Sequence, residues 1–212
     1  MDFIKHNNTV ELLGPYGGDL IHAQSAWTST SRVLTPEKQN RIPDLLKTLA
    51  VNGHHTPFEK SSLHFLVVTD ISTHIQLLKH RIGVSINAES ARYKELKEDK
   101  HYVPQDWPES WQERLCKFVA EGDTLYHQCL TELTESLGRK RAKESARFFK
   151  SYNSQIAADV MFNYRSFFHF QSLRNAPDAQ VEIQQLATQM FELIKQIPGN
   201  PFEHTIKAFE TV

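Results

Sequence analysis

The sequence predicts an α+β fold in which long helices flank a small antiparallel sheet, within a single domain spanning residues 1–212. Two helical stretches support this prediction. Residues 108–138 are long and amphipathic, and residues 178–196 repeat apolar side chains at helical spacing. The third observation is SSLHFLVVTD at 61–70, which has the aliphatic and β-branched composition of a strand. Few strands and several long helices therefore favour helices packed beside a small sheet.

The N-terminal part of the chain contributes a strand and a short helix. Residues 9–19, TVELLGPYGGD, predict a short strand followed by turns at the Gly-Pro and Gly-Gly pairs. Leu45, Leu46 and Leu49 predict a short helix, and the Asn-Gly pair at 52–53 ends it.

A further helix is predicted to follow strand 61–70, starting at Asp70. Its apolar residues recur at i, i+4, i+7 and i+11 and so share one face. This face consists of Ile71, Ile75, Leu78 and Ile82. Gln76, Lys79 and His80 lie on the adjoining face. The polar face of the helix is therefore expected to continue into the charged segment that follows.

From residue 108 onward the chain is predicted to be almost entirely helical. Gly138 ends the first helix of this block, and the next helix starts at Arg139. The final helix is followed by a tail that Pro198 and Pro201 mark.

Composition excludes several classes of function. The formal net charge is -1, so no global field attracts nucleic acid or an anionic membrane. No apolar run is long enough to span a bilayer, and the N-terminus lacks a signal-peptide core, so we expect a cytoplasmic protein. Cys116 and Cys129 are too few for a disulfide framework and lack zinc-site spacing. We expect both cysteines to fill the core.

The segment KHRIGVSINAESARY at 79–93 concentrates cations, hydroxyls and an amide. Lys79, Arg81 and Arg92 supply positive charge, and the planar fork of arginine suits a phosphate group. Ser90 and Asn87 supply short polar groups. The segment indicates an anion-binding site, although a charge-rich helix end exposed to solvent is the plainer alternative.

The segment GHHTPFEK at 53–60 contains tandem histidines. A metal site normally needs three or four ligands, and no HExxH or CxxC pattern accompanies this pair, so we expect no metal. A His-Thr-Pro turn before a strand could instead hold a ligand against the sheet. The plainer alternative is a capped turn with exposed imidazoles.

Basic residues form a stripe at helical spacing in RKRAKESARFFK. The stripe consists of Arg139, Lys143, Arg147 and Lys150. A basic stripe can bind nucleic acid. More often it is a solvated face paired with acidic neighbours, here Glu135 and Glu144.

The segment FNYRSFFHFQSLRNAPDAQVEI at 162–183 alternates cations with aromatic rings. Arginines amid rings suit a flat conjugated ligand that carries an anionic group. An aromatic core with two structural arginines is the alternative. No GxSxG, GxGxxG or P-loop pattern supplies a nucleophile or a phosphate loop, so an enzyme of this sequence would depend on a cofactor for its difficult chemistry.

Three of these segments together resemble the signature segments of flavin-dependent thymidylate synthases: HRIGVSINAESARY, GHHTPFE and NYRSFFHFQSLRNAPDAQVEI. The resemblance extends from about Ser25 to about Ile194. It implies a homotetramer with FAD bound where subunits meet. It also implies conversion of dUMP to dTMP, with methylenetetrahydrofolate as carbon donor, NADPH as reductant of the flavin, and no attacking enzyme cysteine.

The resemblance also assigns residues. Those implied to bind FAD are Ser25, His54, Thr56, Lys79, His80, Arg81, Asn163 and His169. Those implied to bind dUMP are Gln76, Lys79, Ser90, Arg92, Arg147 and Arg174. Arg174 is the implied catalytic residue, because with Arg147 it can fix the uracil and favour negative charge that develops on the ring.

The chain departs from the family pattern in four places. Lys79 stands where the family usually has an arginine, which keeps the charge but loses the bidentate fork. One extra residue lies near Gly83-Val84, and Ala88 stands where an acidic residue is usual, with Glu89 as a possible substitute. After Arg147 the chain reads FFKS in place of a hydrophobic pair and Leu-Pro, so we expect the helix to continue.

These departures motivate an alternative in which the same fold and flavin methylate UMP or hydroxymethylate a uracil nucleotide. A remote alternative is an RNA- or DNA-binding module that uses the basic stripe. That alternative leaves segment 162–183 without a role. We therefore expect no stable nucleic-acid or membrane partner, and dUMP methylation is the leading hypothesis.

Overall fold

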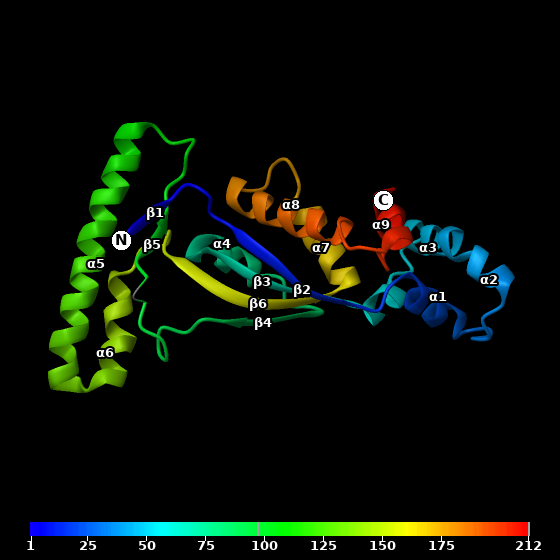
Figure 1. Ribbon diagram of the computed structural model, residues 1–212, viewed down its shortest axis with the longest axis horizontal. Helices are drawn as coiled ribbons and strands as arrows, with labels where there is room; N and C mark the ends of the chain where they lie inside the picture. The colour runs from blue at the N-terminus through cyan, green and yellow to red at the C-terminus, as the bar shows by residue number, and fades with distance from the viewer. Residues whose placement is uncertain (97, 212) are drawn as a thin grey trace. The chain divides into compact units, whose positions relative to one another are not determined.

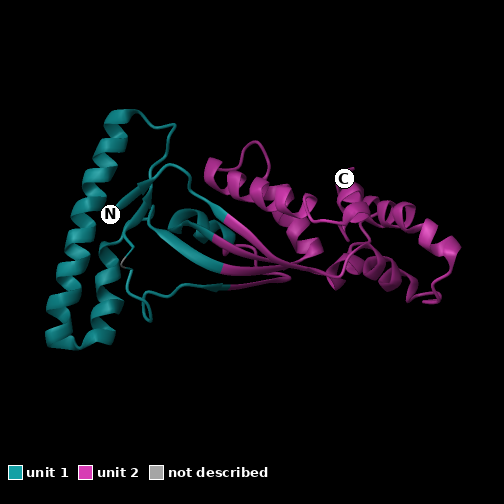
Figure 2. Ribbon diagram, in the orientation of Figure 1, with its two compact units in different colours: residues 1–9, 68–77, 87–158 teal, residues 10–67, 78–86, 159–212 magenta. Residues whose placement is uncertain are grey.

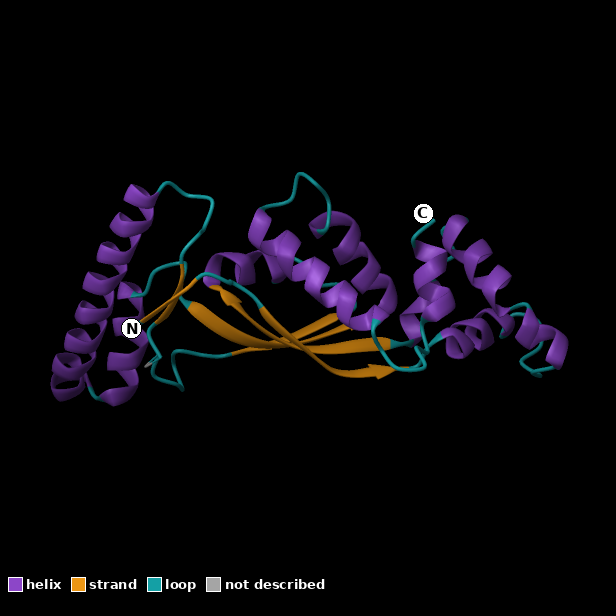
Figure 3. Cartoon of the chain, turned by 45° about the horizontal axis from the view of Figure 1, so that its top comes forward, coloured by secondary structure: helices purple, strands orange, loops and turns teal. Residues whose placement is uncertain are grey.

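A computed structural model describes residues 1–96 and 98–211 of the chain and confirms the α+β class (Figures 1 and 3). Four strands form a small antiparallel sheet in the order β2-β3-β6-β4. These strands are β2 Thr9–Tyr16, β3 Ser62–Asp70, β4 Val84–Ala88 and β6 Gln155–Asn163. A separate two-stranded sheet pairs β1 Asp2–Ile4 with β5 Lys100–Tyr102 in parallel, which the sequence did not predict.

Helices account for most of the remaining chain. The α-helices are α1 Asp19–Trp27, α2 Pro36–Asn40, α3 Ile42–Val51, α4 Ile71–Leu77, α5 Glu109–Leu137, α6 Arg139–Ala146, α7 Tyr164–Arg174, α8 Val181–Lys195 and α9 Glu203–Phe209. Two 3₁₀ helices are η1 Thr56–Lys60 and η2 Arg147–Phe149. No helix within residues 1–96 and 98–211 is long and apolar enough to cross a bilayer.

The chain folds into two compact units, each assembled from three separate segments (Figure 2). Unit 1 comprises residues 1–9, 68–77 and 87–158. Unit 2 comprises residues 10–67, 78–86 and 159–212. That the whole chain acts as one domain stays a prediction.

Aromatic packing holds α7 on the sheet in unit 2. Phe65 of β3 stacks on Phe167 of α7 with ring centroids 5.8 Å apart, and Phe162 of β6 contacts Phe167 and Phe170. All four rings are fully or almost fully buried. Offset and edge-on ring contacts favour a fixed geometry, so the polar residues of α7 are held at defined positions.

A buried polar network lies at the other helical cluster of unit 2, formed by α1, η1 and α9. The fully buried His22 contacts Thr205 Oγ1 through Nδ1 at 2.9 Å and Ser61 Oγ through Nε2 at 2.6 Å. Asp19 in turn accepts hydrogen bonds from the Thr205 hydroxyl and backbone N–H. Burial lowers the pKa of His22 to about 4, so this imidazole is neutral near pH 7.

In unit 1 the long helix α5 packs beside α6 (Figure 1). α5 carries a buried acid, Asp123. Asp123 accepts a hydrogen bond from His101 of β5 at 2.7 Å and binds Lys150 Nζ at 2.7 Å. Buried ionic groups are tolerated when they are paired in this way. The two predicted core cysteines both lie in α5 and are partly buried free thiols.

Most of the predicted long elements are confirmed. The strand at 61–70 corresponds to β3, the helix at 108–138 to α5, and the final helix to α8. Apolar positions of α8 face the core as expected. These buried residues are Ile183, Leu186, Ala187, Met190 and Ile194.

Several local predictions are wrong. The helix expected from Asp70 through Ile82 spans only Ile71–Leu77, and Ile82 is 89% exposed. The block after residue 108 is not almost entirely helical, because β6 runs from Gln155 to Asn163 with alternate residues buried. β2 continues through the predicted Gly-Pro turn, and the proline-marked tail contains α9.

The prediction that α6 continues past Arg147 is also wrong. α6 ends at Ala146, one 3₁₀ turn follows, and Lys150 has extended backbone angles. The basic stripe is therefore not one helical face. Lys150, its last member, has a side chain that is only 3% exposed and is paired with two carboxylates.

Candidate active site

A hydrogen bond joins two of the predicted site residues of unit 2, Arg174 and His80. Arg174, the last residue of α7, donates from Nε to Nε2 of the buried His80 at 3.0 Å. The His80 ring also meets Phe170 edge-on at 5.0 Å. Burial, then the charges of Arg174 and His169, lowers the pKa of His80 to about 4, which keeps Nε2 available as an acceptor.

Asn163 fixes the start of α7, at the end of the helix opposite Arg174. Its Oδ1 accepts a hydrogen bond from the Ser166 backbone N–H at 2.8 Å, as expected of an N-cap. Its own N–H donates to the Gly83 carbonyl at 2.8 Å. Gly83 has φ +66°, and a methyl group added there would overlap Asn163 Nδ2 and Ser166 Oγ. Only glycine allows the chain to pass so close to this helix start.

Three sequence segments that were singled out separately line one pocket in unit 2, with a volume of about 530 Å³. The lining residues are His55, Glu59, Ile82, Gly83, Asn163, Arg165, Ser166, Phe168, His169 and Ser172. Arg165 forms an ion pair with Glu59 at the pocket. This arrangement offers rings, amides and a cation to one ligand, which suits a flat conjugated group with anionic substituents.

The predicted FAD residues all lie in unit 2, but only Asn163 and His169 line this pocket. The other predicted FAD residues do not line it. Ser25 is half-buried in α1, His54 and Thr56 are exposed at the turn into η1, and Lys79 and Arg81 are exposed on either side of His80. From the tandem histidines the pocket takes His55, whose Nε2 contacts the Ala50 carbonyl at 3.1 Å, where the resemblance implied His54.

Sequence reasoning missed His55, Glu59 and Arg165 as pocket residues. Arg165 best fits the alternative for segment 162–183, an aromatic core with two structural arginines, yet its side chain is 51% exposed. A signal existed for Glu59, because GHHTPFEK was already a candidate segment. Periodicity could not identify His55, since the two adjacent histidines precede a 3₁₀ turn whose direction the sequence does not reveal.

The predicted nucleotide residues divide between the units: Gln76, Ser90, Arg92 and Arg147 in unit 1, Lys79 and Arg174 in unit 2. Gln76 is half-buried in α4. Ser90 begins a turn, because its carbonyl accepts hydrogen bonds from the N–H groups of Tyr93 and Lys94. Arg92 donates from Nε to Glu144 Oε1 at 2.9 Å, so this guanidinium is held by a carboxylate of α6.

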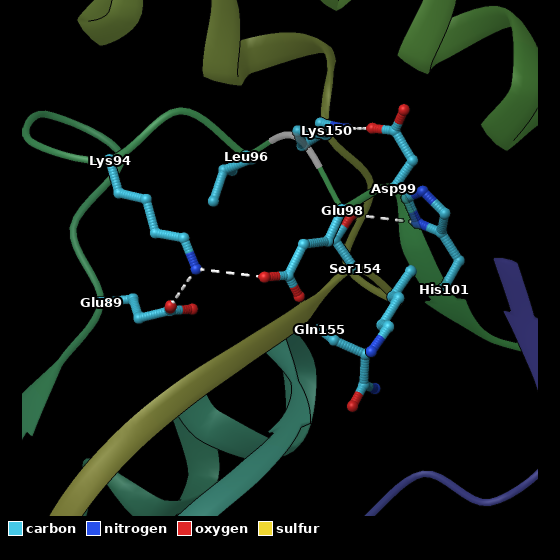
Figure 4. Close-up of a pocket in the computed structure, with 10 residues that line it drawn as sticks. Glu89, Lys94, Leu96, Glu98, Asp99, His101, Lys150, Ser154 and Gln155 are labelled. Atoms are coloured by element: carbon cyan, nitrogen blue, oxygen red, sulfur yellow. Dashed lines mark hydrogen bonds and ion pairs between the residues drawn. The ribbon is translucent and has the colours of Figure 1, made fainter. Parts of the chain in front are cut away.

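Glu89, the possible substitute for the missing acid at Ala88, fastens the turn to the sheet. Its backbone N–H donates to the Ala157 carbonyl at 2.9 Å, and its Oε2 accepts from the Ala157 N–H at 3.1 Å. Its Oε1 binds Lys94 Nζ at 2.6 Å (Figure 4). Both carboxylate oxygens of Glu89 thus have partners within the protein. Glu89 therefore does not replace the free acidic group that the family usually has at position 88.

The described part of the chain contains one cluster with metal-ligand chemistry, formed by Asp99, His101 and Asp123. The Lys150 ammonium lies between its two carboxylates, 2.5 Å from Asp99 Oδ1 and 2.7 Å from Asp123 Oδ1. A divalent ion would have to displace this buried cation. We therefore interpret the cluster as an internal ion pair rather than a metal site.

An α+β chain whose pocket offers rings, an amide and a guanidinium suits a flat organic cofactor, as in the class of cofactor-dependent enzymes. Comparison with known proteins narrows the class. Residues 12–198 match the family described as thymidylate synthase complementing protein. Proteins named flavin-dependent thymidylate synthase from Thermosipho africanus and Pseudothermotoga lettingae are each 31% identical, and each alignment covers 93% of this chain and 90% of the relative.

Solved structures agree with this comparison. The UMP/dUMP methylase PolB from Streptomyces cacaoi, bound with 5-Br dUMP, superposes with a TM-score of 0.79 at 25% identity, covering 100% of this chain and 97% of PolB. The chain belongs to the family of flavin-dependent thymidylate synthases. It is therefore an enzyme of methyltransferase type whose family uses FAD, with folate and NADPH as co-substrates.

The pocket residues of unit 2 fit this cofactor. Asn163 and His169 can contact a flavin ring. Arg165 can bind an anionic part of FAD if its ion pair with Glu59 breaks. Gly83 lets the chain lie against the start of α7, where an added Cβ would overlap Asn163 and Ser166. The polar groups face a pocket rather than a closed core, as a binding site requires.

Proposed function

We propose that this chain converts dUMP to dTMP, taking the carbon from methylenetetrahydrofolate and using NADPH to reduce FAD. The observation that carries the proposal is that segments 53–60, 79–93 and 162–183 contribute to one pocket, in a member of the flavin-dependent family. We propose a homotetramer whose active sites lie at subunit interfaces. A cytoplasmic location stays a prediction from the sequence.

In this proposal the chain's own residues bind and polarise the nucleotide. Ser90 and Arg92 hold the 5′-phosphate, and Gln76 and Lys79 complete the nucleotide contacts. Arg174 and Arg147 fix the uracil and stabilise negative charge that develops on the ring. Bound FAD supplies the hydride and one-carbon transfer chemistry.

The Arg174–His80 hydrogen bond orients the proposed catalytic guanidinium. Because Nε donates to an imidazole that stays neutral, the bond persists across the physiological pH range. Arg92 must exchange its carboxylate partner Glu144 for the phosphate. A carboxylate that holds an arginine before substrate arrives keeps the guanidinium near its working position at low cost.

No cysteine nucleophile is needed in this scheme. Cys116 and Cys129 lie in α5 of unit 1, and burial raises the pKa of the Cys116 thiol. A thiol with a raised pKa is a poor nucleophile at neutral pH. The double substitution Cys116→Ala/Cys129→Ala should therefore leave turnover intact.

One observation favours a second candidate, methylation of UMP. The structural relative PolB is described as acting on UMP as well as dUMP. Lys79, Ala88 and the extra residue near Gly83-Val84 are departures close to the proposed nucleotide and flavin residues. Hydroxymethylation of a uracil nucleotide is a further form of this alternative.

The deciding experiment is the mass of the product. Purified protein is incubated with FAD, NADPH and methylenetetrahydrofolate, and with either dUMP or UMP, and the nucleotide is analysed by mass spectrometry. A gain of one methylene unit on dUMP, dependent on FAD, supports the proposal. The same gain on UMP alone moves the substrate to the ribonucleotide, and a hydroxymethyl product changes the reaction. No product from either nucleotide, with flavin bound, contradicts the proposal.

A further inference from the structure

The segment that carries Arg147 is anchored by features that the nucleotide proposal does not use. α6 ends at Ala146, and Arg147 starts the 3₁₀ turn η2, with its side chain exposed. The Lys150 N–H donates to the Arg147 carbonyl at 3.1 Å, which closes this turn. Arg147 and Lys150 are thus rigidly connected through one short turn.

The first anchor is a close backbone contact between η2 and α5. A Cβ added at Gly122 would lie 2.7 Å from the Phe149 carbonyl oxygen. Gly122 lies within the 29-residue helix α5, where glycine is a poor helix former. Its place there is explained by packing, because any side chain would push Phe149 away from the helix.

The second anchor is the buried ammonium of Lys150. It binds Asp123 on α5, the neighbour of Gly122. It also binds Asp99, as Figure 4 shows. Its Nζ also lies 4.6 Å from the centre of the Tyr126 ring. Burial acts to raise the pKa of Asp99, but hydrogen bonds from Lys150 and His127 outweigh it and hold that pKa below its ordinary value.

Asp99 and Asp123 are also held by contacts with groups other than Lys150. His101 donates to or accepts from Ser154 through Nδ1 at 3.2 Å, and its Nε2 binds Asp123 Oδ2 at 2.7 Å. Asp99 has φ +43°, and its carbonyl accepts a hydrogen bond from the Asp2 N–H at 2.8 Å. A buried ion pair whose members are all hydrogen-bonded has one well-defined geometry.

A cavity in unit 1 lies between the Lys150 anchor and the turn that carries Ser90 and Arg92, the other predicted nucleotide residues of this region. A cavity of about 40 Å³, large enough for ordered water, is lined by both Lys150 and Glu89 (Figure 4). Glu89 fastens the Ser90 turn to Ala157, as described above. The Ser90–Arg92 turn and the Arg147 turn therefore both rest on the polar interior of unit 1.

We propose that Lys150 and Gly122 are positioning residues for Arg147: the ammonium of Lys150, held by Asp99 and Asp123, and the side-chain-free surface of Gly122 fix the turn that presents Arg147 to a pyrimidine nucleotide. This inference rests on the proposed function. It assigns a role to Lys150, which takes the place of the hydrophobic residue usual in the Leu-Pro pair of the family.

The test is direct binding of dUMP and UMP by calorimetry to the flavin-loaded protein, which requires no turnover. Gly122→Ala leaves every charge in place and favours the helix, yet it displaces Phe149. We expect it to weaken nucleotide binding about tenfold, because small misplacements of a binding group have large effects. Lys150→Met should weaken binding by a similar factor, and Lys117→Met, an exposed lysine on α5, should change nothing.

A double-mutant cycle distinguishes positioning from a general effect on folding. Arg147→Ala alone should weaken nucleotide binding about tenfold or more, and adding Gly122→Ala should weaken it no further, because the two act through one group. Flavin absorbance serves as the fold control, since the proposed FAD residues belong to unit 2. If Lys150→Met fails to fold, Gly122→Ala and its cycle with Arg147→Ala decide the question.

Two results would overturn the inference and are distinguishable from each other. Nucleotide binding by Gly122→Ala equal to that of the unmodified protein, or effects of Gly122→Ala and Arg147→Ala that multiply, would reject the positioning role while leaving the proposed function standing. An unmodified protein that binds neither nucleotide would reject the proposed function, and the positioning role with it.

Discussion

The two units hold their predicted ligand residues by different physical means. In unit 2, the Arg174–His80 bond is made to a neutral imidazole, and stacked rings support the helix that carries it. In unit 1, Arg92 is held by Glu144 and the Arg147 turn by a buried ammonium between two carboxylates. In unit 2 the arginine is held by a partner that stays uncharged, whereas in unit 1 both partners of each pair are charged.

This difference teaches what each region responds to. A hydrogen bond to a neutral, buried imidazole leaves no ion pair for salt to screen, but acid disrupts it, because an imidazole that gains a proton loses its acceptor nitrogen. The Arg92–Glu144 pair is partly exposed, with the Arg92 side chain 47% accessible, so salt screens it. We therefore expect acid to weaken the Arg174–His80 hydrogen bond of unit 2. We expect high ionic strength to weaken the Arg92–Glu144 ion pair of unit 1.

The largest expected effect is that of Arg174→Ala. Removing the guanidinium should lower the turnover rate by about 10³-fold, because a preorganised group that stabilises developing charge is lost. Flavin absorbance should remain, since the pocket residues are untouched. Steady-state kinetics and the visible spectrum measure both quantities, and near-normal turnover would show that Arg174 is not catalytic.

Gly83→Ala tests the steric basis of the unit 2 site. The added methyl group meets Asn163 and Ser166 at a positive φ angle, so we expect a loss of about 3 kcal/mol in the free energy of unfolding and weaker flavin retention. Gly199→Ala is the matched control, because Gly199 also has positive φ but no neighbour within 4 Å. Equal losses for the two variants would mean that backbone strain alone, and not the close approach, is responsible.

Acid should destabilise unit 2 through His22. The folded-state pKa of about 4 lies below the unfolded value of 6.5, so only the unfolded chain gains a proton between these values. This contribution to stability is complete above pH 6.5 and falls by about 3 kcal/mol as the pH drops to about 4. Urea unfolding between pH 7 and pH 4 measures it.

The variant His22→Gln provides the comparison for this pH dependence. It should be less stable at pH 7, yet lose less of its unfolding free energy on acidification. His6→Gln, at an exposed position, should follow the unmodified protein. A His22→Gln curve parallel to that of the unmodified protein would assign the acid sensitivity to other groups.

The smallest expected effect is that of Glu144→Gln on unit 1. Arg92 would no longer be held by a carboxylate, so the nucleotide phosphate would face less competition and bind up to about fivefold tighter, as expected for an exposed ion pair. Calorimetric titration at low and high salt measures this change, with Glu135→Gln on α5 as the control. Weaker binding by Glu144→Gln would instead mean that the carboxylate mainly orients Arg92.

The sequence predicted the long elements of the fold because their patterns are strong. α5 and α8 carry many helical periods, and β3 alternates half-buried and buried residues from Ser62 to Thr69. β6 was missed because it follows a helical segment without a glycine or proline break. α9 was missed because two prolines suggested an irregular tail, although Phe202 and Phe209 anchor it in the core.

The site was predictable in its segments but not in its contacts. Residue types and spacing identified the three segments that line the pocket of unit 2. They could not show that His80 meets Arg174, since 94 residues separate them. Nor could they show that Lys150 is buried, because a lysine in a basic stretch has the same local pattern whether it faces water or a distant Asp99.

The path of the chain between the two units limits how the gene for this protein can be divided or recombined. The chain passes from one unit to the other within β2, β3, β4 and β6, and once more at the end of α4. No single cut yields either unit as a continuous fragment, so gene fission or exchange of a terminal half would break both. A change of nucleotide preference therefore cannot come from exchanging one unit as a single continuous segment.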